Sequence, residues 1–211
     1  YFTGRLPADP IGRLFSTVAY AKGIIYSNKE EAHQTIDRIN SIHSGIEKAR
    51  GAAIPAWAYR DVLYMLIHYS IASFELLERK LTGDEKEELY NVFYRMGLRM
   101  GLEELPTNYV DWLPAREHHM KNDLEKTAYT IDLFRQYKKH LGPARFRVLK
   151  QAQLLVMPLT VKNMLGFGKF SWLTPVVPLY KLSRVLRFDH VIKNILLPPA
   201  YHQQIKELDM Y

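Results

Sequence analysis

The sequence predicts an all-α fold of about eight helices, and three observations support this prediction. Apolar residues recur at helical spacing along most of the 211-residue chain. Residues typical of helix starts, such as Asn28 and Thr82, and of helix ends, such as Gly142, separate the apolar segments. We find no convincing strand pattern, internal repeat or linker in the sequence. We therefore expect a single helical domain over residues 1–211.

Four helices are expected in the first half of the chain. Asp9 suits an N-cap and Pro10 a first helical position, where the missing N–H costs nothing. Asn28 with Glu31 three residues later predicts a capping box, and the segment 82–85 predicts another. The third helix is apolar on most sides, so we expect it to be buried. The four helices span about residues 10–26, 28–51, 58–81 and 82–101.

Proline and glycine divide the second half of the chain. Pro114 is expected to interrupt a helix because an interior proline removes a backbone hydrogen bond, and Pro158 is expected to kink another. Asn122 or Asp123 is the expected N-cap of a helix that Gly142 ends. A loop is expected at 167–174 and a short amphipathic tail after residue 199. The helices span about residues 108–120, 122–142, 144–165, 176–187 and 190–196.

Composition excludes several kinds of site. Cysteine is absent, which excludes disulfides, Cys-ligated zinc, iron–sulfur clusters and thiolate-ligated haem. The net charge of +7 suits nucleic acid, an anionic membrane surface or an anionic cofactor. The densest basic patches, 135–140 and 145–150, lie on predicted helices with acidic residues nearby or apolar residues between. We therefore favour solvated helix faces and expect no nucleic-acid partner, while peripheral membrane contact stays open.

The sequence shows no targeting or membrane-spanning segment. It contains no run of 18 apolar residues and no signal peptide. Because the chain opens on Tyr1 and not on Met, we expect that its native N-terminus, with any anchor or signal, is missing. We expect a cytoplasmic protein, and the sequence leaves its oligomeric state open.

Two polar features interrupt the apolar faces of the first two helices. Helical spacing brings Arg13, Ser16 and Thr17 onto one face of the first helix. His43 lies on a face of the second helix that is otherwise isoleucine. A histidine in apolar surroundings can ligate a metal or haem iron, and a guanidinium with two hydroxyls can bind a small polar reactant.

A structural role competes with each of these interpretations. His43 can be a core histidine bonded to a neighbour, and the hydroxyls of Ser16 and Thr17 can bond to the preceding helical turn. In the third helix, His68 can be a second haem ligand, a pocket donor or a core histidine. Arg60, in the first turn of that helix, can reach a haem propionate or solvent.

Other histidines carry less weight. Glu30 and His33 have the spacing of one half of a carboxylate-bridged di-iron site, but such a site needs the motif twice. His118 and His119 are adjacent, so they cannot face one site together on a helix. The Walker A, Rossmann, zinc-protease and serine-hydrolase motifs are absent from the sequence.

The order and spacing of several motifs resemble the MpaB / latex-clearing-protein family of b-type haem oxygenases. The resemblance covers roughly the first half of the chain. It rests on Arg13-Leu14-Phe15-Ser16-Thr17, Asn28-Lys29-Glu30-Glu31-Ala32, Arg38-Ile39-Asn40-Ser41-Ile42-His43 with Gly45, Tyr59-Arg60-Asp61, Leu66-Ile67-His68, Leu81-Thr82-Gly83-Asp84-Glu85, Gly101 and Leu105-Pro106-Thr107.

This resemblance implies a globin-like core with one haem b, His43 as the proximal iron ligand, and Arg13 and Thr17 in the distal pocket. In the rubber-cleaving members a lysine precedes the threonine and can cap the iron, whereas Ser16 stands at that position here. Those members also use a glutamate upstream of the arginine, and Asp9 does not match it. We therefore do not expect polyisoprene cleavage.

The favoured hypothesis is a haem-b-dependent oxygenase that oxidises a smaller apolar, unsaturated or isoprenoid substrate with O2. Its site residues are His43 as metal ligand, Arg13, Ser16 and Thr17 as catalytic residues, and His68 and Arg60 as further cofactor-binding residues. Two alternatives are a non-catalytic haem or gas-binding protein and a helical interaction module without cofactor.

Overall fold

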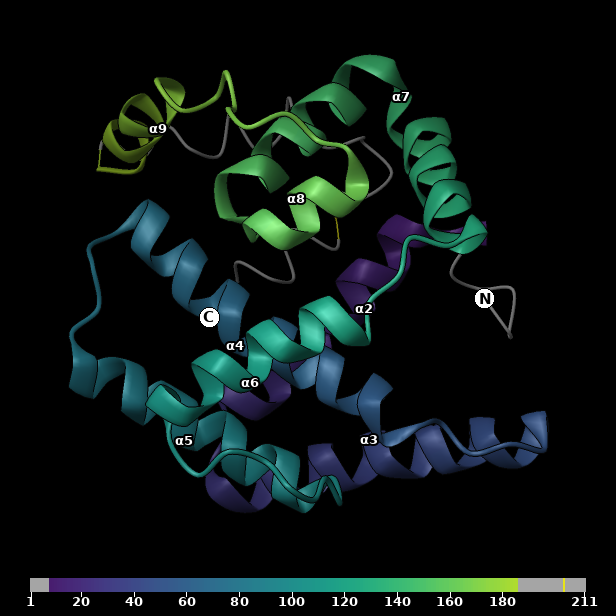
Figure 1. Ribbon diagram of the computed structural model, residues 1–211. Coiled ribbons are helices and arrows are strands. Elements are labelled where there is room, and N and C mark those ends of the chain that lie inside the picture. Colours follow the sequence, from purple (N-terminus) through teal and green to yellow (C-terminus); the bar gives the residue numbers. More distant parts are fainter. Residues whose placement is uncertain (1–7, 186–202, 204–211) are drawn as a thin grey trace. The chain divides into compact units, whose positions relative to one another are not determined.

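The computed structural model describes residues 8–185 and residue 203, and it confirms the all-α prediction. Figure 1 shows helices joined by loops throughout the described chain. Its eight helices are α2 (Pro10–Ile25), α3 (Lys29–Arg50), α4 (Ala56–Leu77), α5 (Gly83–Arg99), α6 (Tyr109–Asn122), α7 (Ala128–Val156), α8 (Leu159–Leu165) and α9 (Val176–Val185). None of these helices combines the length and hydropathy needed to cross a bilayer.

The chain divides into two compact units. The mid-chain unit is Tyr20–Glu125, and the terminal unit combines Tyr1–Ala19 with Lys126–Tyr211. The expectations of one domain over 1–211 and of a globin-like core stay predictions. The helix expected at 190–196 and the tail after residue 199 lie outside the described residues, apart from residue 203.

The core of the mid-chain unit forms where α4 packs against α5 and α6. Its eight buried members are Leu63, Tyr64, Ile67, Ile71, Tyr90, Leu102, Leu105 and Trp112. The helices approach closely at Gly97, where an added Cβ would lie 2.7 Å from Leu63 Cδ2. Burial of α4 is one-sided, since Val62 and Met65 are exposed. The expectation that α4 is buried on most sides is therefore only partly met.

The helix starts follow the local sequence signals. Asp9 Oδ1 accepts the N–H of Gly12 at 2.9 Å, and Asn28 Oδ1 accepts the N–H of Glu31 at 3.0 Å. At α5, Thr82 Oγ1 accepts the N–H of Glu85 at 3.2 Å while the Glu85 carboxylate accepts the N–H of Thr82 at 2.8 Å. Each bond satisfies a backbone donor that has no partner within its helix, so these boundaries are set locally.

Four predicted features in the helices need correction. The helix α6 runs through Pro114, which is exposed on its outer side, and the next helix begins after Thr127 instead of Asn122 or Asp123. The helix expected to reach residue 81 ends at Leu77, because the Glu75 side chain accepts the N–H of Leu81 at 3.3 Å and turns the chain. Pro158 separates two helices and does not merely kink one.

In the terminal unit, α7 bends sharply at its glycine. Gly142 has a φ of 75°, which a residue with a side chain rarely adopts. The helical geometry is therefore interrupted at Gly142, where the sequence predicted that a helix ends. Phe134 packs edge-on against Phe146 and Phe167 across this bend. The ring of His140 reaches the carbonyl of Ala8 at 3.0 Å and holds the start of α2 to α7.

Candidate functional site

His43 lies on α3 in a half-buried position, and its Nδ1 atom is shielded from solvent. Its ring centroid is 5.2 Å from that of Tyr59 in the first turn of α4. The Tyr59 hydroxyl donates to Glu47 Oε1 at 3.4 Å, and the same oxygen accepts the N–H of Ile54 at 2.7 Å. Because Glu47 lies one turn after His43 on α3, it fixes both the connecting loop and the aromatic ring beside the histidine.

Burial raises the pKa of Tyr59, and the nearby Glu47 charge and hydrogen bond raise it further. This phenol therefore stays neutral at physiological pH. Its hydroxyl points to the carboxylate, so the side chain presents its apolar ring to His43. The surroundings of His43 thus include the apolar contact that was expected for an iron-ligating histidine.

Arg60 follows Tyr59 on α4 and carries a polar atom that lacks a partner. Its Nε is buried, and no hydrogen-bond acceptor among the described residues reaches it. The guanidinium lies close enough to Tyr64 to oppose the rise in pKa that burial causes for that tyrosine. A buried N–H donor without an acceptor is costly, so this position favours binding of an anionic group.

His68 shares a helix face with Arg60, since Arg60, Tyr64 and His68 follow one another at intervals of four residues. The histidine is half-buried, and its ring lies 5.0 Å from that of Tyr69. The mid-chain unit therefore holds the three predicted cofactor-binding residues, one on α3 and two on α4. A shared contact of all three with one ligand stays a prediction.

Arg13, Ser16 and Thr17 lie together on α2 and bond mainly to one another. The hydroxyls of Ser16 and Thr17 both donate to the carbonyl of Arg13, at 2.8 Å and 3.0 Å. The Arg13 guanidinium donates to Ser16 Oγ at 3.4 Å. These are the bonds to the preceding turn that the structural interpretation expected. The three residues belong to the terminal unit, so their position opposite His43 stays a prediction.

A buried histidine between two carboxylates is the polar cluster that sequence reasoning missed. His119 on α6 is 3% exposed. Its Nδ1 lies 2.6 Å from Asp123 Oδ2 and its Nε2 lies 3.2 Å from Asp61 Oδ1. The ring also packs edge-on against Tyr64, with centroids 5.6 Å apart. This cluster joins α6 to the second turn of α4, next to Arg60.

The chemistry of the Asp61–His119–Asp123 cluster follows from its donors and acceptors. Carboxylate oxygens accept hydrogen bonds, so the imidazole N–H groups are the donors that can link His119 to Asp61 and Asp123. A sequence signal was available, because His119 follows the buried Trp112 by seven residues and precedes Asp123 by four, so all three share a helix face. The adjacent His118 is exposed, so only one of these two neighbouring histidines faces the core.

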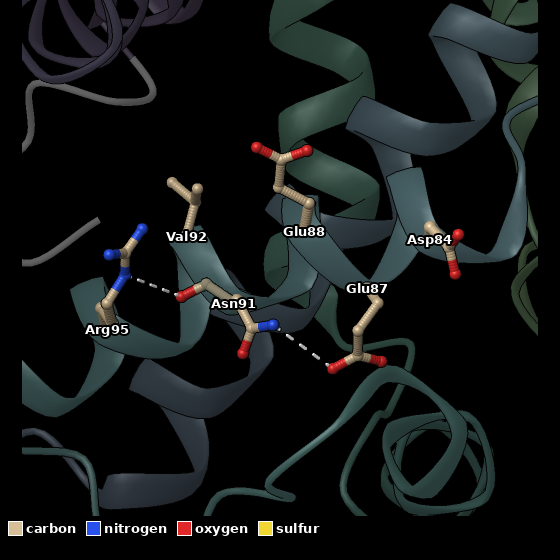
Figure 2. A pocket seen from close by; sticks show the side chains of 6 residues that line it. All are labelled: Asp84, Glu87, Glu88, Asn91, Val92 and Arg95. Atoms are coloured by element: carbon tan, nitrogen blue, oxygen red, sulfur yellow. Dashed lines mark hydrogen bonds between the residues drawn. The ribbon is translucent and has the colours of Figure 1, made fainter.

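A surface pocket of about 550 Å³ lies along α5, where Figure 2 shows its lining side chains. They are Asp84, Glu87, Glu88, Asn91, Val92 and Arg95. The Glu87 carboxylate also accepts the N–H of Tyr109 at 2.9 Å, so it caps the start of α6. This acidic lining suits neither haem propionates nor an apolar substrate. Among the described residues, no group of three or more His, Asp or Glu side chains is arranged to hold a metal ion.

Comparison with known proteins identifies the family. No curated protein and no solved structure matches the chain. The family model described as "ER-bound oxygenase mpaB/B'/Rubber oxygenase, catalytic domain" matches residues 2–203, nearly the whole chain. This match extends the resemblance seen in the first half of the sequence to both compact units. The chain therefore belongs to the mpaB and rubber oxygenase catalytic-domain family.

Proposed function

We propose that this chain is a haem-b-dependent oxygenase domain that oxidises an apolar, unsaturated or isoprenoid small molecule with O2. The observation that carries the proposal is the family match over residues 2–203, because members of an oxygenase family act on small molecules with O2. The finer elements of the proposal are the cofactor, the ligand residues and the substrate class.

The donor set of the mid-chain unit fits a haem. A neutral imidazole is a common axial ligand of haem iron, and His43 has the half-buried, aromatic-lined position that such a ligand needs. The buried Nε of Arg60 is suited to a propionate, which would supply the missing acceptor. We assign His68 as a pocket donor or second ligand. When bound, the haem iron supplies the redox chemistry of O2 activation.

The protein residues orient the reactants and exclude water. Glu47 holds Tyr59 against His43, which limits rotation of the imidazole. Arg13 is the candidate donor toward O2 or a polar group of the substrate, with Ser16 and Thr17 as secondary donors. Since both hydroxyls donate to the Arg13 carbonyl, either must rotate away from that carbonyl before it donates to O2.

Absorption spectroscopy of the chain expressed with a haem precursor tests this proposal. We expect a Soret band that His43→Ala abolishes and that His33→Ala leaves unchanged. His33 is a matched control because it is a half-buried histidine on the same helix. Loss of the band in both variants would indicate general misfolding, which circular dichroism would detect. A band retained in His43→Ala, or absent from the parent chain, would refute the proposal.

A non-catalytic haem or gas-binding role is the second candidate. Two features favour it: Ser16 replaces the lysine of the rubber-cleaving members, and its hydroxyl is already bonded within α2. Reversible O2 or CO binding without oxidation of any alkene would support this role. A folded chain with no Soret band after reconstitution would instead favour a helical interaction module. We also propose a cytoplasmic location.

A further inference from the structure

The excess positive charge of the chain resides in one segment of the terminal unit. Residues 133–188 contain no aspartate or glutamate. Of the 29 basic residues in the chain, eleven lie here: Arg135, Lys138, Lys139, Arg145, Arg147, Lys150, Lys162, Lys169, Lys181, Arg184 and Arg187. The rest of the chain therefore carries 18 basic and 22 acidic residues. Along residues 133–188 the charged side chains are therefore all positive.

Five large apolar side chains are exposed within residues 170–182 of the same segment. Phe170 is 89% exposed, and Trp172 in the same loop is 51% exposed. The other exposed apolar residues of α8 and α9 are Leu159, Val176, Leu179 and Leu182. Exposed apolar residues that gather in one short stretch of the chain indicate a candidate binding surface, whereas single scattered ones do not.

The helix α9 arranges its apolar residues in a stripe. Val176, Leu179 and Leu182 follow one another at intervals of three residues, which brings them onto one side of the helix. Lys181 lies on the other side, where it is half-buried. An amphipathic helix normally buries its apolar face, and here that face points outward among the described residues.

The loop before α9 holds its two aromatic side chains in place. Ser171, between them, is 8% exposed, and its hydroxyl donates to the carbonyl of Gln151 on α7 at 2.8 Å. The N–H of Trp172 donates to Gln151 Oε1 at 3.1 Å. Because the middle residue is fixed inward, Phe170 and Trp172 are directed outward by the folded backbone. Their exposure is thus a property of the fold.

We propose that this surface, formed by Phe170, Trp172 and the α9 stripe within the acid-free segment, binds the anionic face of a lipid bilayer. Aromatic and aliphatic side chains enter the interfacial layer, while lysine and arginine interact with anionic headgroups. A second copy would bring two positively charged segments together, and a nucleic acid offers little apolar surface to the stripe. Charge and apolarity together favour the lipid surface. This inference does not depend on haem binding.

Vesicle co-sedimentation of the full chain provides the test. We expect binding to vesicles in which phosphatidylserine is about a third of the lipid, weak binding to pure phosphatidylcholine, and weaker binding as salt screens the charges. Leu179→Gln/Leu182→Gln should lower the partition coefficient at least about tenfold, because two apolar side chains no longer enter the interface. Lys169→Gln should lower it about fivefold.

The matched control is Val92→Gln/Leu98→Gln, which changes two similarly exposed apolar residues on α5, 47% and 48% exposed. This control should bind as the parent does, and thermal unfolding should show that both double variants are folded. Absence of binding to anionic vesicles would overturn the proposal. So would equal binding by the stripe variant and its control, which would indicate charge attraction alone. Self-association lost in the stripe variant, without lipid binding, would assign the surface to a second copy.

Discussion

Replacing His119 should destabilise the mid-chain unit, because it is a buried polar link between α4 and α6. The change His119→Ala removes the 2.6 Å bond to Asp123, the 3.2 Å bond to Asp61 and the packing against Tyr64. Hydrogen bonds to charged groups contribute about 1.5–3 kcal/mol each. The Asp61 and Asp123 side chains are 24% and 35% exposed, so water can partly replace the lost donor and the lower end of that range applies.

The expected loss of unfolding free energy is therefore about 3 kcal/mol from the two bonds and about 1 kcal/mol from the lost ring contact. For a chain of this size, a loss of about 4 kcal/mol lowers the Tm by roughly 8–16 °C. Urea unfolding and thermal unfolding, both followed by far-UV circular dichroism, measure the two quantities.

His118→Ala is the matched control, since it removes the adjacent but exposed histidine. Its effect should stay within about 0.5 kcal/mol, as for other surface substitutions. A double-mutant cycle of His119→Ala with Asp123→Asn should give a coupling energy above about 1 kcal/mol. Equal effects of the two histidine substitutions, or a loss below about 1 kcal/mol for His119→Ala, would refute the assignment of the cluster as a link between helices.

Three further changes test charge, cofactor binding and packing. Lys80 and Lys86 hold the pKa of Glu75 at about 2, below its ordinary 4.5, so its stabilising effect is present above pH 4.5 and lost as the pH falls toward 2. Glu75→Gln should lower stability at neutral pH by about 1 kcal/mol, after allowance for solvent screening, and flatten the acid limb of a pH–stability curve. In the proposed haem-bound form, Arg60→Met should raise the haem dissociation rate, measured by transfer to apomyoglobin, at least about tenfold through loss of one charge-assisted bond. Gly45→Ala should raise the free energy of unfolding by about 0.5–1 kcal/mol in urea titrations, because alanine favours the helix and the added Cβ contacts nothing within 4 Å.

Each of these predictions has a control in the same unit. Glu88→Gln removes an exposed carboxylate from α5 and should leave the acid limb unchanged. Arg38→Met removes an exposed arginine from α3 and should leave haem transfer unchanged. Gly97→Ala should gain nothing in stability, since its Cβ would lie 2.7 Å from Leu63 Cδ2 and 2.8 Å from Leu105 Cδ1. The opposite result in any pair would contradict the corresponding argument.

The helix boundaries that the sequence predicted correctly are those set by local hydrogen bonds. Asp9, Asn28 and Thr82 cap their helices by contacts within three residues, so neighbouring residues contain the required information. The end of α4 at Leu77 was missed because it depends on a Glu75 bond to the backbone of residue 81 and on two lysines beyond the helix. Pro114 was misjudged because its exposed position lets the helix continue past the lost bond.

The family was predictable from residue type and order. The motifs around His43 indicated the family, and the match over residues 2–203 confirmed it. The partners of these residues could not be predicted, because Tyr59 meets His43 only through the packing of two helices. His119 was discounted on the ground that adjacent histidines face apart. That geometric argument was sound, yet it left open which of the two points into the core.

The sequence by itself determined the all-α class, the capped helix starts, the family and the segregation of charge into residues 133–188. These properties depend on periodicity, neighbouring residues and composition, which are contained in the order of the chain. Only the tertiary structure decided that Asp61 and Asp123 enclose His119, that Arg60 keeps a buried donor, and that the apolar stripe of α9 faces outward. These depend on which helix faces meet, and contacts between residues as far apart as 61 and 119 are fixed only when the helices pack.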